Sequence, residues 1–206
     1  MRLIITCFEL ISTIAFSASG AMVGIKKQMD YFGICMLGII TAVGGGVMRD
    51  LILGLTPPAA FLHPEYTIVA FLVSMLAIVP AIRRNMSRSL TEKILFASDS
   101  VGLGIFTVSG YHTAIQTQYN SRWFLVLFVA VITGVGGGVL RDVLAGERPY
   151  IFVKHIYACA SIAGGMLCII IHVLFGSDYI AMVLGCLVIV LIRYFSMRYK
   201  LNLPHA

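Results

Sequence analysis

The sequence predicts an all-α integral membrane protein with seven transmembrane helices, six of which form an inverted repeat of two three-helix units. Three observations support this prediction. Hydrophobic residues make up 59% of the 206 residues and charged residues 12%, and the mean hydropathy is +0.95. The apolar runs are about 20 residues long, which suits helices that cross a bilayer. Several sequence features also occur twice, once in each half of the chain.

Seven apolar segments follow one another along the chain, separated by short linkers. As a helix, a run of about 22 residues reaches roughly 33 Å, enough to cross the hydrocarbon core. The predicted spans are Leu3 to Gly24, Tyr31 to Leu53, Tyr66 to Ile82, Glu92 to Thr113, Trp123 to Leu144, Tyr150 to Phe175 and Tyr179 to Met197. Residues 1–206 are therefore expected to form a single transmembrane domain.

The first span has some features of a signal peptide, because Arg2 precedes an apolar run that ends in small residues. Two observations oppose this interpretation. Glu9 interrupts the apolar run, and Phe16-Ser17-Ala18-Ser19-Gly20 returns in mid-chain as Phe106-Thr107-Val108-Ser109-Gly110. We expect a segment that is half of a repeat to be retained, as the first transmembrane helix.

The repeat relates the two halves of the chain at a nearly constant spacing. Gly44-Gly45-Gly46-Val47-Met48-Arg49-Asp50 corresponds to Gly136-Gly137-Gly138-Val139-Leu140-Arg141-Asp142, and Glu9 corresponds to Asp99. The first repeat is assigned to residues 1–82 and the second to residues 90–175. Each unit has three spans, and an odd number inserts the second unit upside down, as in many transporters and some channels. The seventh helix, residues 179–200, lies outside the repeat.

The distribution of basic residues predicts the orientation in the membrane. Arg2 and Arg122 fall on one side, and eleven others fall on the opposite side: Lys26, Lys27, Arg83, Arg84, Arg88, Lys93, Arg148, Lys154, Arg193, Arg198 and Lys200. By the positive-inside rule, the amino terminus is outside and the carboxyl terminus is cytoplasmic in a cell membrane. Because topology accounts for the formal charge of +6, no nucleic-acid partner is expected.

Charged residues within the spans are the first candidates for a functional site, because a charge near the bilayer centre costs roughly 3 kcal/mol or more. Arg49 and Arg141 are predicted to lie about 20 Å apart in depth, on opposite sides of the membrane centre. Glu9 shares the depth of Arg49, and Asp99 that of Arg141. The hypothesis is two ion pairs, Glu9 with Arg49 and Asp99 with Arg141. Asp50 and Asp142 point about 100° away from the neighbouring arginines and are expected to need separate partners.

The two glycine triplets, Gly44–Gly46 and Gly136–Gly138, permit two interpretations. Small residues let membrane helices approach closely, so the triplets could form a packing face. Three consecutive glycines cover most of a helical turn, however, and a local break or kink is favoured. Such a break frees carbonyl oxygens, which suit a monovalent cation that loses its hydration shell. The triplets are therefore expected beside a transport pathway.

The other polar residues give weaker signals. Ser17, Ser19, Thr107 and Ser109 could line a pathway, although serine in a membrane helix commonly bonds to its own backbone. His155 and His172 have no partner at metal-ligand spacing, and the five cysteines match neither a zinc site nor a disulfide framework. No nucleophile with a base, nucleotide-binding loop or carboxylate dyad is present. Neither enzymatic activity, nor a bound metal, nor a cofactor is expected.

The doubled glycine-arginine-aspartate motif, preceded by Phe16–Gly20 and Phe106–Gly110, resembles the trimeric intracellular cation channel family, in particular its prokaryotic branch, also known as the glycine transporter domain family. The resemblance covers about the first 175 residues as a double repeat. It implies a homotrimer in membrane lipid, with a pore in each protomer lined mainly by the second and fifth helices. It also implies that Arg49, Asp50, Arg141 and Asp142 fix or gate this pore.

The resemblance thus implies a channel that conducts potassium and other monovalent cations. A carrier for a small zwitterion such as glycine is the alternative, because an inverted repeat with broken helices also suits alternating access. A zwitterion could use both an arginine and a carboxylate. A structural or assembly protein would show neither single-channel currents nor saturable uptake.

Overall fold

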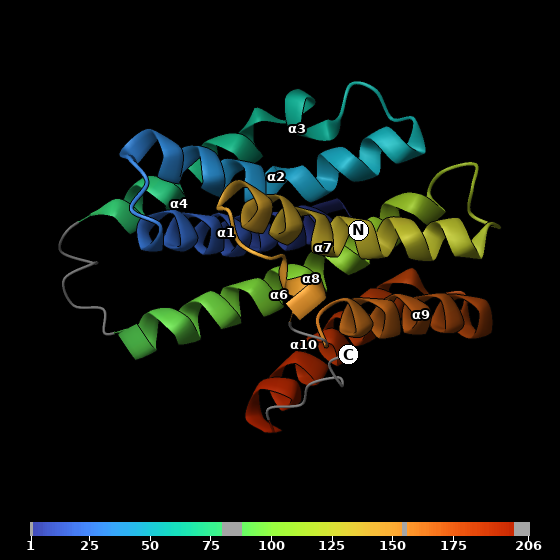
Figure 1. Ribbon diagram of the computed structural model, residues 1–206. Helices are drawn as coiled ribbons and strands as arrows, with labels where there is room; N and C mark the ends of the chain where they lie inside the picture. Colours follow the sequence, from blue (N-terminus) through green and yellow to red (C-terminus); the bar gives the residue numbers. More distant parts are fainter. Residues whose placement is uncertain (1, 80–87, 154–155, 200–206) are drawn as a thin grey trace.

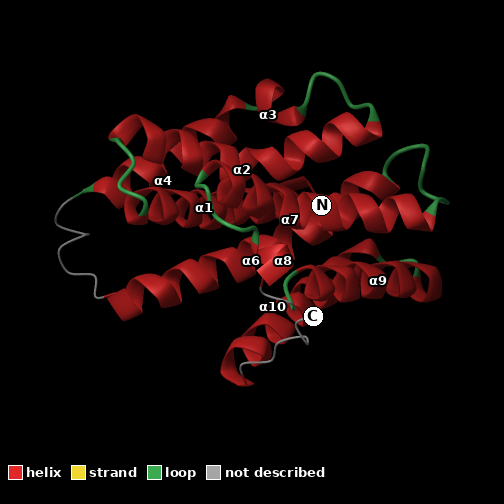
Figure 2. Ribbon diagram, viewed as in Figure 1, coloured by secondary structure: helices red, strands yellow, loops and turns green. Residues whose placement is uncertain are grey.

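The computed structural model describes residues 2–79, 88–153 and 156–199, and every regular element in these ranges is a helix (Figure 2). The helices are α1 Arg2–Lys26, α2 Tyr31–Leu53, α3 Ala59–Leu62, α4 Pro64–Ile78, α6 Arg88–Ile115, α7 Trp123–Leu144, α8 Tyr150–Val153, α9 Ala158–Phe175 and α10 Asp178–Tyr199. The all-α prediction is therefore confirmed for the described part of the chain.

Six of these helices are long and apolar enough to cross a membrane: α1, α2, α6, α7, α9 and α10. The predicted second and fifth spans agree with α2 and α7 at both ends. α4 is also apolar but has 15 residues, and it is the shorter counterpart of the predicted third span. Ile82, where that span was expected to end, lies outside the described residues, as do Arg83, Arg84, Lys154 and Lys200.

Short helices that were not predicted accompany the third and sixth predicted spans. The one-turn helix α3 comes before α4, and the predicted sixth span, Tyr150 to Phe175, divides into α8 and α9. The backbone N–H of Ala59 donates to Asp50 Oδ2 at 2.8 Å, and that of Tyr150 donates to Asp142 Oδ2 at 2.9 Å. A carboxylate at a helix N-terminus is favourable, so each aspartate holds the next short helix against its own helix end.

The ends of α2 and α7 are built alike. Gly54 and Gly146 adopt left-handed backbone conformations, with φ of +71° and +66°, which glycine reaches without strain. The N–H of Leu55 donates to Asp50 O, and the N–H of Glu147 donates to Asp142 O, both at 2.8 Å. These matching terminations turn the chain sharply toward α3 in one half and toward α8 in the other.

The two glycine triplets meet where α2 and α7 pack together at the centre of the molecule (Figure 1). A Cβ atom at Gly45 would meet Thr133 O, and one at Gly137 would meet Thr41 O, both closer than 3.0 Å. Both helices continue through their triplets, so the predicted break is wrong, whereas the kink that was named as its alternative stays a prediction. The glycines allow close backbone approach instead, which is the packing interpretation.

The register of these contacts shows that α2 and α7 run antiparallel. Gly44 faces Leu140, whereas Met48, one turn later in α2, faces Gly136, one turn earlier in α7. The neighbouring helices pack in the same way in both halves. Gly20 of α1 lies against Thr41 of α2, and Gly110 of α6 lies against Thr133 of α7, each too close to accept a Cβ.

Candidate functional site

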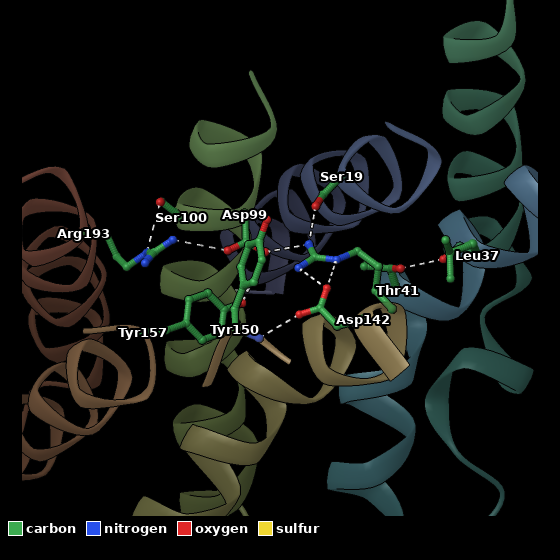
Figure 3. A network of polar contacts seen from close by, with 10 residues as sticks. Ser19, Leu37, Thr41, Asp99, Ser100, Asp142, Tyr150, Tyr157 and Arg193 are labelled. Carbon is green, nitrogen blue, oxygen red and sulfur yellow. Dashed lines mark hydrogen bonds and ion pairs between the residues drawn. The ribbon is translucent and has the colours of Figure 1, made fainter. Parts of the chain in front are cut away.

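A buried cluster of charged side chains surrounds Asp99 of α6, and Figure 3 shows it between Arg193 on one side and Asp142 on the other. Arg141 Nη1 of α7 lies 2.8 Å from Asp99 Oδ1, and both side chains are 0% exposed. The predicted ion pair between these residues is therefore present. Tyr157, 1% exposed, donates its hydroxyl to Asp99 Oδ1 at 3.4 Å, and Arg193 Nη2 of α10 lies 3.5 Å from Asp99 Oδ2.

Arg141 also binds the aspartate next to it in sequence. Its Nε donates to Asp142 Oδ1 at 2.9 Å, and its Nη1 donates to Ser19 Oγ of α1. The expectation that Asp142 needs a separate partner is wrong, because the long arginine side chain folds back along the helix surface. Asp99 and Asp142 together balance the charges of Arg141 and Arg193, which lets the cluster remain buried.

A second cluster surrounds Glu9 of α1. Tyr66 donates its hydroxyl to Glu9 Oε2 at 2.7 Å, and Ser109 donates to Glu9 Oε1 at 3.3 Å. Arg49 Nε donates to Asp50 Oδ1 at 2.8 Å, so these neighbours are also partners, and Arg49 Nη1 donates to Ser109 Oγ at 3.5 Å. In the described structure no ion pair joins Glu9 to Arg49 directly. The predicted pair is replaced by a link through Ser109.

The two clusters contain equivalent residues in equivalent relations. Each has an arginine bound to the next aspartate, a serine from the opposite half of the chain and a tyrosine hydroxyl that donates to the carboxylate. Tyr157 follows Tyr66 by 91 residues, close to the offset of the glycine motif. The clusters differ in exposure, because Glu9 and Tyr66 are half-buried whereas Asp99 and Tyr157 are fully buried.

A cavity of about 450 Å³ opens beside the Glu9 cluster. Its wall includes the carboxylates of Glu9, Asp50 and Glu65 and the guanidinium of Arg49, together with Thr13 and Phe106. Three carboxylates against one arginine make the cavity acidic, which favours cations. Among the described residues, no three His, Cys, Asp or Glu side chains are placed to hold a metal ion together.

Two phenylalanines separate the cavity from the Asp99 cluster. Along α1, Glu9 and Thr13 line the cavity, Phe16 follows, and Ser19 reaches Arg141. The ring of Phe16 is 0% exposed and lies 5.1 Å, centroid to centroid, from that of Phe106. A Cβ at Gly102 or Gly137 would meet the Phe16 ring, so the two helices close around it. The centre of the molecule is therefore tightly packed.

The four polar candidates from the first and fourth spans have two different roles. Ser19 and Ser109 join the charged clusters. Ser17 Oγ lies 2.9 Å from Ser74 Oγ of α4, and Thr107 Oγ1 lies 2.8 Å from Ser161 Oγ of α9. These buried contacts fasten α1 to α4 and α6 to α9.

Three residues of the clusters were not predicted: Tyr66, Tyr157 and Arg193. The repeat contained a signal for the tyrosines, because both follow the short helix after a glycine motif. Arg193 was counted only among the basic residues of the cytoplasmic side, and its side chain is 2% exposed. An arginine within an apolar helix was the available signal, since such a charge needs a buried partner.

These features define a multi-pass helical membrane protein with two similar charge clusters, one fully buried and one beside a cavity, on either side of a tightly packed centre. The comparisons with known proteins agree with this class. The family model described as "Glycine transporter" matches residues 6–81 and 96–173, and the chain belongs to this family.

Bacterial relatives are similar over almost the whole chain. The UPF0126 inner membrane protein YadS of Escherichia coli (strain K12) is 37% identical over 197 residues, which cover 95% of this chain and 93% of the relative. A UPF0126 membrane protein of Deinococcus radiodurans is 35% identical over 198 residues, with 95% and 89% covered.

Solved structures of TRIC cation channels have the same fold. A prokaryotic TRIC channel crystallised in 0.5 M KCl superposes with a TM-score of 0.90 at 32% identity, covering 98% of this chain and 100% of the other. A chain from a study of conductance through TRIC cation channels gives 0.86 at 36% identity, with 98% and 96% covered. The trimeric intracellular cation channel orthologue from Rhodobacter sphaeroides gives 0.84 at 30% identity, with 96% and 99% covered. These neighbours support a cation channel.

Proposed function

We propose that this chain is a potassium-permeable monovalent cation channel with a conduction pathway inside each protomer. The observation that carries the proposal is the similarity to solved TRIC cation channels over 96–98% of the chain at 30–36% identity. The acidic cavity beside Glu9 gives the pathway an entrance of the right charge. Potassium and sodium are then transported ions rather than bound cofactors.

The pathway runs from this cavity past Phe16 and Phe106 to the Asp99 cluster. α2 and α7 supply Arg49, Asp50, Arg141 and Asp142, and α1 and α6 supply the opposing carboxylates. Because the two phenylalanine rings are packed against each other, conduction requires them to separate. In this proposal α2 and α7 move relative to each other at the contact between Gly44–Gly46 and Gly136–Gly138, and no permanent break in either helix is needed.

The proposal extends to the assembly of the chain and its placement in the membrane. One neighbour is called a trimeric channel and one relative an inner membrane protein, which supports a homotrimer in the lipid of the inner membrane. The chain forms a single domain, residues 1–206. Residues 1–82 and 90–175 are inverted repeats, and residues 179–200 are the seventh helix. The amino terminus is outside and the carboxyl terminus cytoplasmic.

Planar-bilayer recording tests the channel proposal directly. The purified wild-type protein is expected to give discrete current steps in potassium chloride. Under a potassium chloride gradient across the bilayer, the reversal potential of these steps should follow the potassium gradient. A chloride-selective reversal potential, or the absence of steps from verified trimers, would contradict the proposal. Replacement of potassium by N-methylglucamine should abolish inward steps when it is applied on the side from which cations enter.

A carrier for a small zwitterion such as glycine is the second candidate. The cavity favours it in one respect, because Arg49 could bind a carboxylate and Glu9 an ammonium group within the same space. Vesicle assays separate the two functions. Saturable glycine uptake that shows counterflow, without current steps, supports the carrier, whereas potassium currents without glycine counterflow support the channel.

A further inference from the structure

Arg193 is a charged residue for which the repeat provides no counterpart, because α10 follows both repeat units. Its Nη2 lies 3.5 Å from Asp99 Oδ2, and its Nε donates to Ser100 Oγ at 3.3 Å. Figure 3 shows it approaching Asp99 from the side opposite to Asp142. Asp99 therefore has two cationic partners, one from within the repeat and one from outside it.

Aromatic rings hold the Arg193 guanidinium on two sides. Its Cζ lies 4.7 Å from the centroid of the Phe96 ring and 4.8 Å from that of the Tyr157 ring. Ring faces attract cations, and the attraction is larger where water is excluded. Oxygen atoms and aromatic faces together form a desolvated site for a single positive charge, and Arg193 occupies it.

The corresponding place at the other end of the molecule is open. The offset of 90 residues relates Asp99 to Glu9 and Phe96 to Thr6, and Tyr157 follows Tyr66 by 91 residues. Glu9, Thr6 and Tyr66 all line the 450 Å³ cavity. Glu9 and Tyr66 thus line a cavity, whereas the corresponding Asp99 and Tyr157 contact an arginine.

We infer that Arg193 is a tethered cation that occupies the monovalent-cation site at the Asp99 end of the pathway and keeps that end closed. This inference rests on the proposed channel function. Withdrawal of Arg193 would leave Asp99 paired with Arg141 and would free Asp99 Oδ2, Ser100 Oγ and the face of the Tyr157 ring. Such oxygen atoms can replace part of the hydration shell of a monovalent ion. Movement of α10 against α6 would then control access.

Thermal unfolding in detergent tests the site independently of conduction. The variants are Arg193→Gln, Asp99→Asn/Arg193→Gln and, as the control, Arg198→Gln, which removes an exposed charge from the same helix. Melting temperatures are compared in potassium chloride and in N-methylglucamine chloride at equal ionic strength.

Potassium is expected to raise the melting temperature of Arg193→Gln by about 2–4 °C more than that of the wild type. The double variant and the control should show no such gain. Equal potassium dependence in Arg193→Gln and the wild type would overturn the inference.

Bilayer recording tests the blocking role. Arg193→Gln is expected to raise the open probability about fivefold or more, whereas Arg193→Lys, which keeps the charge, should remain closer to the wild type. An assembled Arg193→Gln trimer with wild-type open probability overturns the inference. If Arg193→Gln does not assemble, Phe96→Leu replaces it, because it removes one aromatic face and leaves every charge. An unchanged open probability in Phe96→Leu then overturns the inference.

The two readouts separate the inference from the channel proposal. A wild-type protein without current steps contradicts the channel, while the potassium-dependent melting temperature of Arg193→Gln still decides whether Arg193 occupies a cation site. If the wild type gives currents, and Arg193→Gln has the open probability and the potassium-dependent melting temperature of the wild type, the inference about Arg193 is contradicted while the channel proposal stands.

Discussion

At the scale of single residues, the environment of a carboxylate determines its role more than its place in the sequence repeat. Asp99 is 0% exposed and lies between two guanidinium groups. Glu9 is half-buried at the wall of a cavity, where a tyrosine and a serine hydroxyl donate to it. The first carboxylate therefore neutralises buried charge, and the second faces a cavity, where the proposed channel function would bring it into contact with cations.

Replacement of these two carboxylates by amides is expected to have unequal effects on stability. Asp99→Asn leaves Arg141 with Asp142 as its carboxylate partner and removes the carboxylate with which Arg193 pairs. Loss of one partner from a buried ion pair costs about 3–5 kcal/mol. Glu9→Gln, the matched control, should cost about 1 kcal/mol or less, because its site is partly hydrated. Melting temperatures of the two variants in the same detergent measure the difference, and an equal loss for both would contradict this account of the clusters.

At the scale of elements, the glycine triplets show where a sequence pattern is ambiguous. Three consecutive glycines fit both a broken helix and a close helix contact, and the residues of the partner helix decide between them. α2 and α7 each present a triplet at the same crossing, so the backbones approach directly. Both helices continue through the triplets without a break, and the small residues allow the close contact.

Alanine substitutions distinguish two glycines that form this contact from a third, Gly46, that does not. Gly45→Ala and Gly137→Ala would each press a Cβ atom against a backbone carbonyl of the other helix. Such overpacking costs about 1–3 kcal/mol and is expected to lower the melting temperature. At Gly46, the closest side-chain atom that a Cβ would meet is Arg49 Nη2, at 3.9 Å. Gly46→Ala should be neutral or stabilising by up to about 1 kcal/mol, because alanine favours the helix. Equal destabilisation by all three substitutions would show that the contact is not the reason for the glycines.

At the scale of the whole molecule, the sequence predicted what depends on periodicity and depth and missed what depends on tertiary contacts. The ends of α2 and α7 followed from their apolar runs, and the Asp99–Arg141 pair followed from equal depth in neighbouring helices. Equal depth was not sufficient for Glu9 and Arg49, because Ser109 and Tyr66 compete for the same carboxylate. The burial of Arg193 depends on how α10 packs against α6, which no spacing within the repeat encodes.

The packing directions also predict that α4 crosses the membrane despite its 15 residues. α2 and α7 are antiparallel, and α6 and α7 form an antiparallel pair, because Gly110 meets Thr133 whereas Thr107 meets Gly134. α6 therefore runs in the same direction as α2, so the chain must return across the membrane between them. α4 supplies this return, since Tyr66 lies beside Glu9 and Ser74 lies beside Ser17, in the direction of α1. Its length of about 22 Å is short of a full bilayer core, and the preceding α3 and local thinning of the bilayer make up the difference.

Cysteine accessibility measures this crossing. In a background without the five native cysteines, Lys26→Cys places a single thiol at the exposed end of α1, beside the linker that follows, and Asn120→Cys places one in the exposed linker that follows α6. If α4 crosses, these linkers lie on opposite sides of the membrane. A membrane-impermeant maleimide should then label Asn120→Cys in intact cells and Lys26→Cys only after permeabilisation, in agreement with the basic residues on the side of Lys26. Arg198→Cys, at the end of α10, should behave like Lys26→Cys. Labelling of the thiols at positions 26 and 120 from the same side would mean that α4 does not cross, and the second three-helix unit would then not be inverted relative to the first.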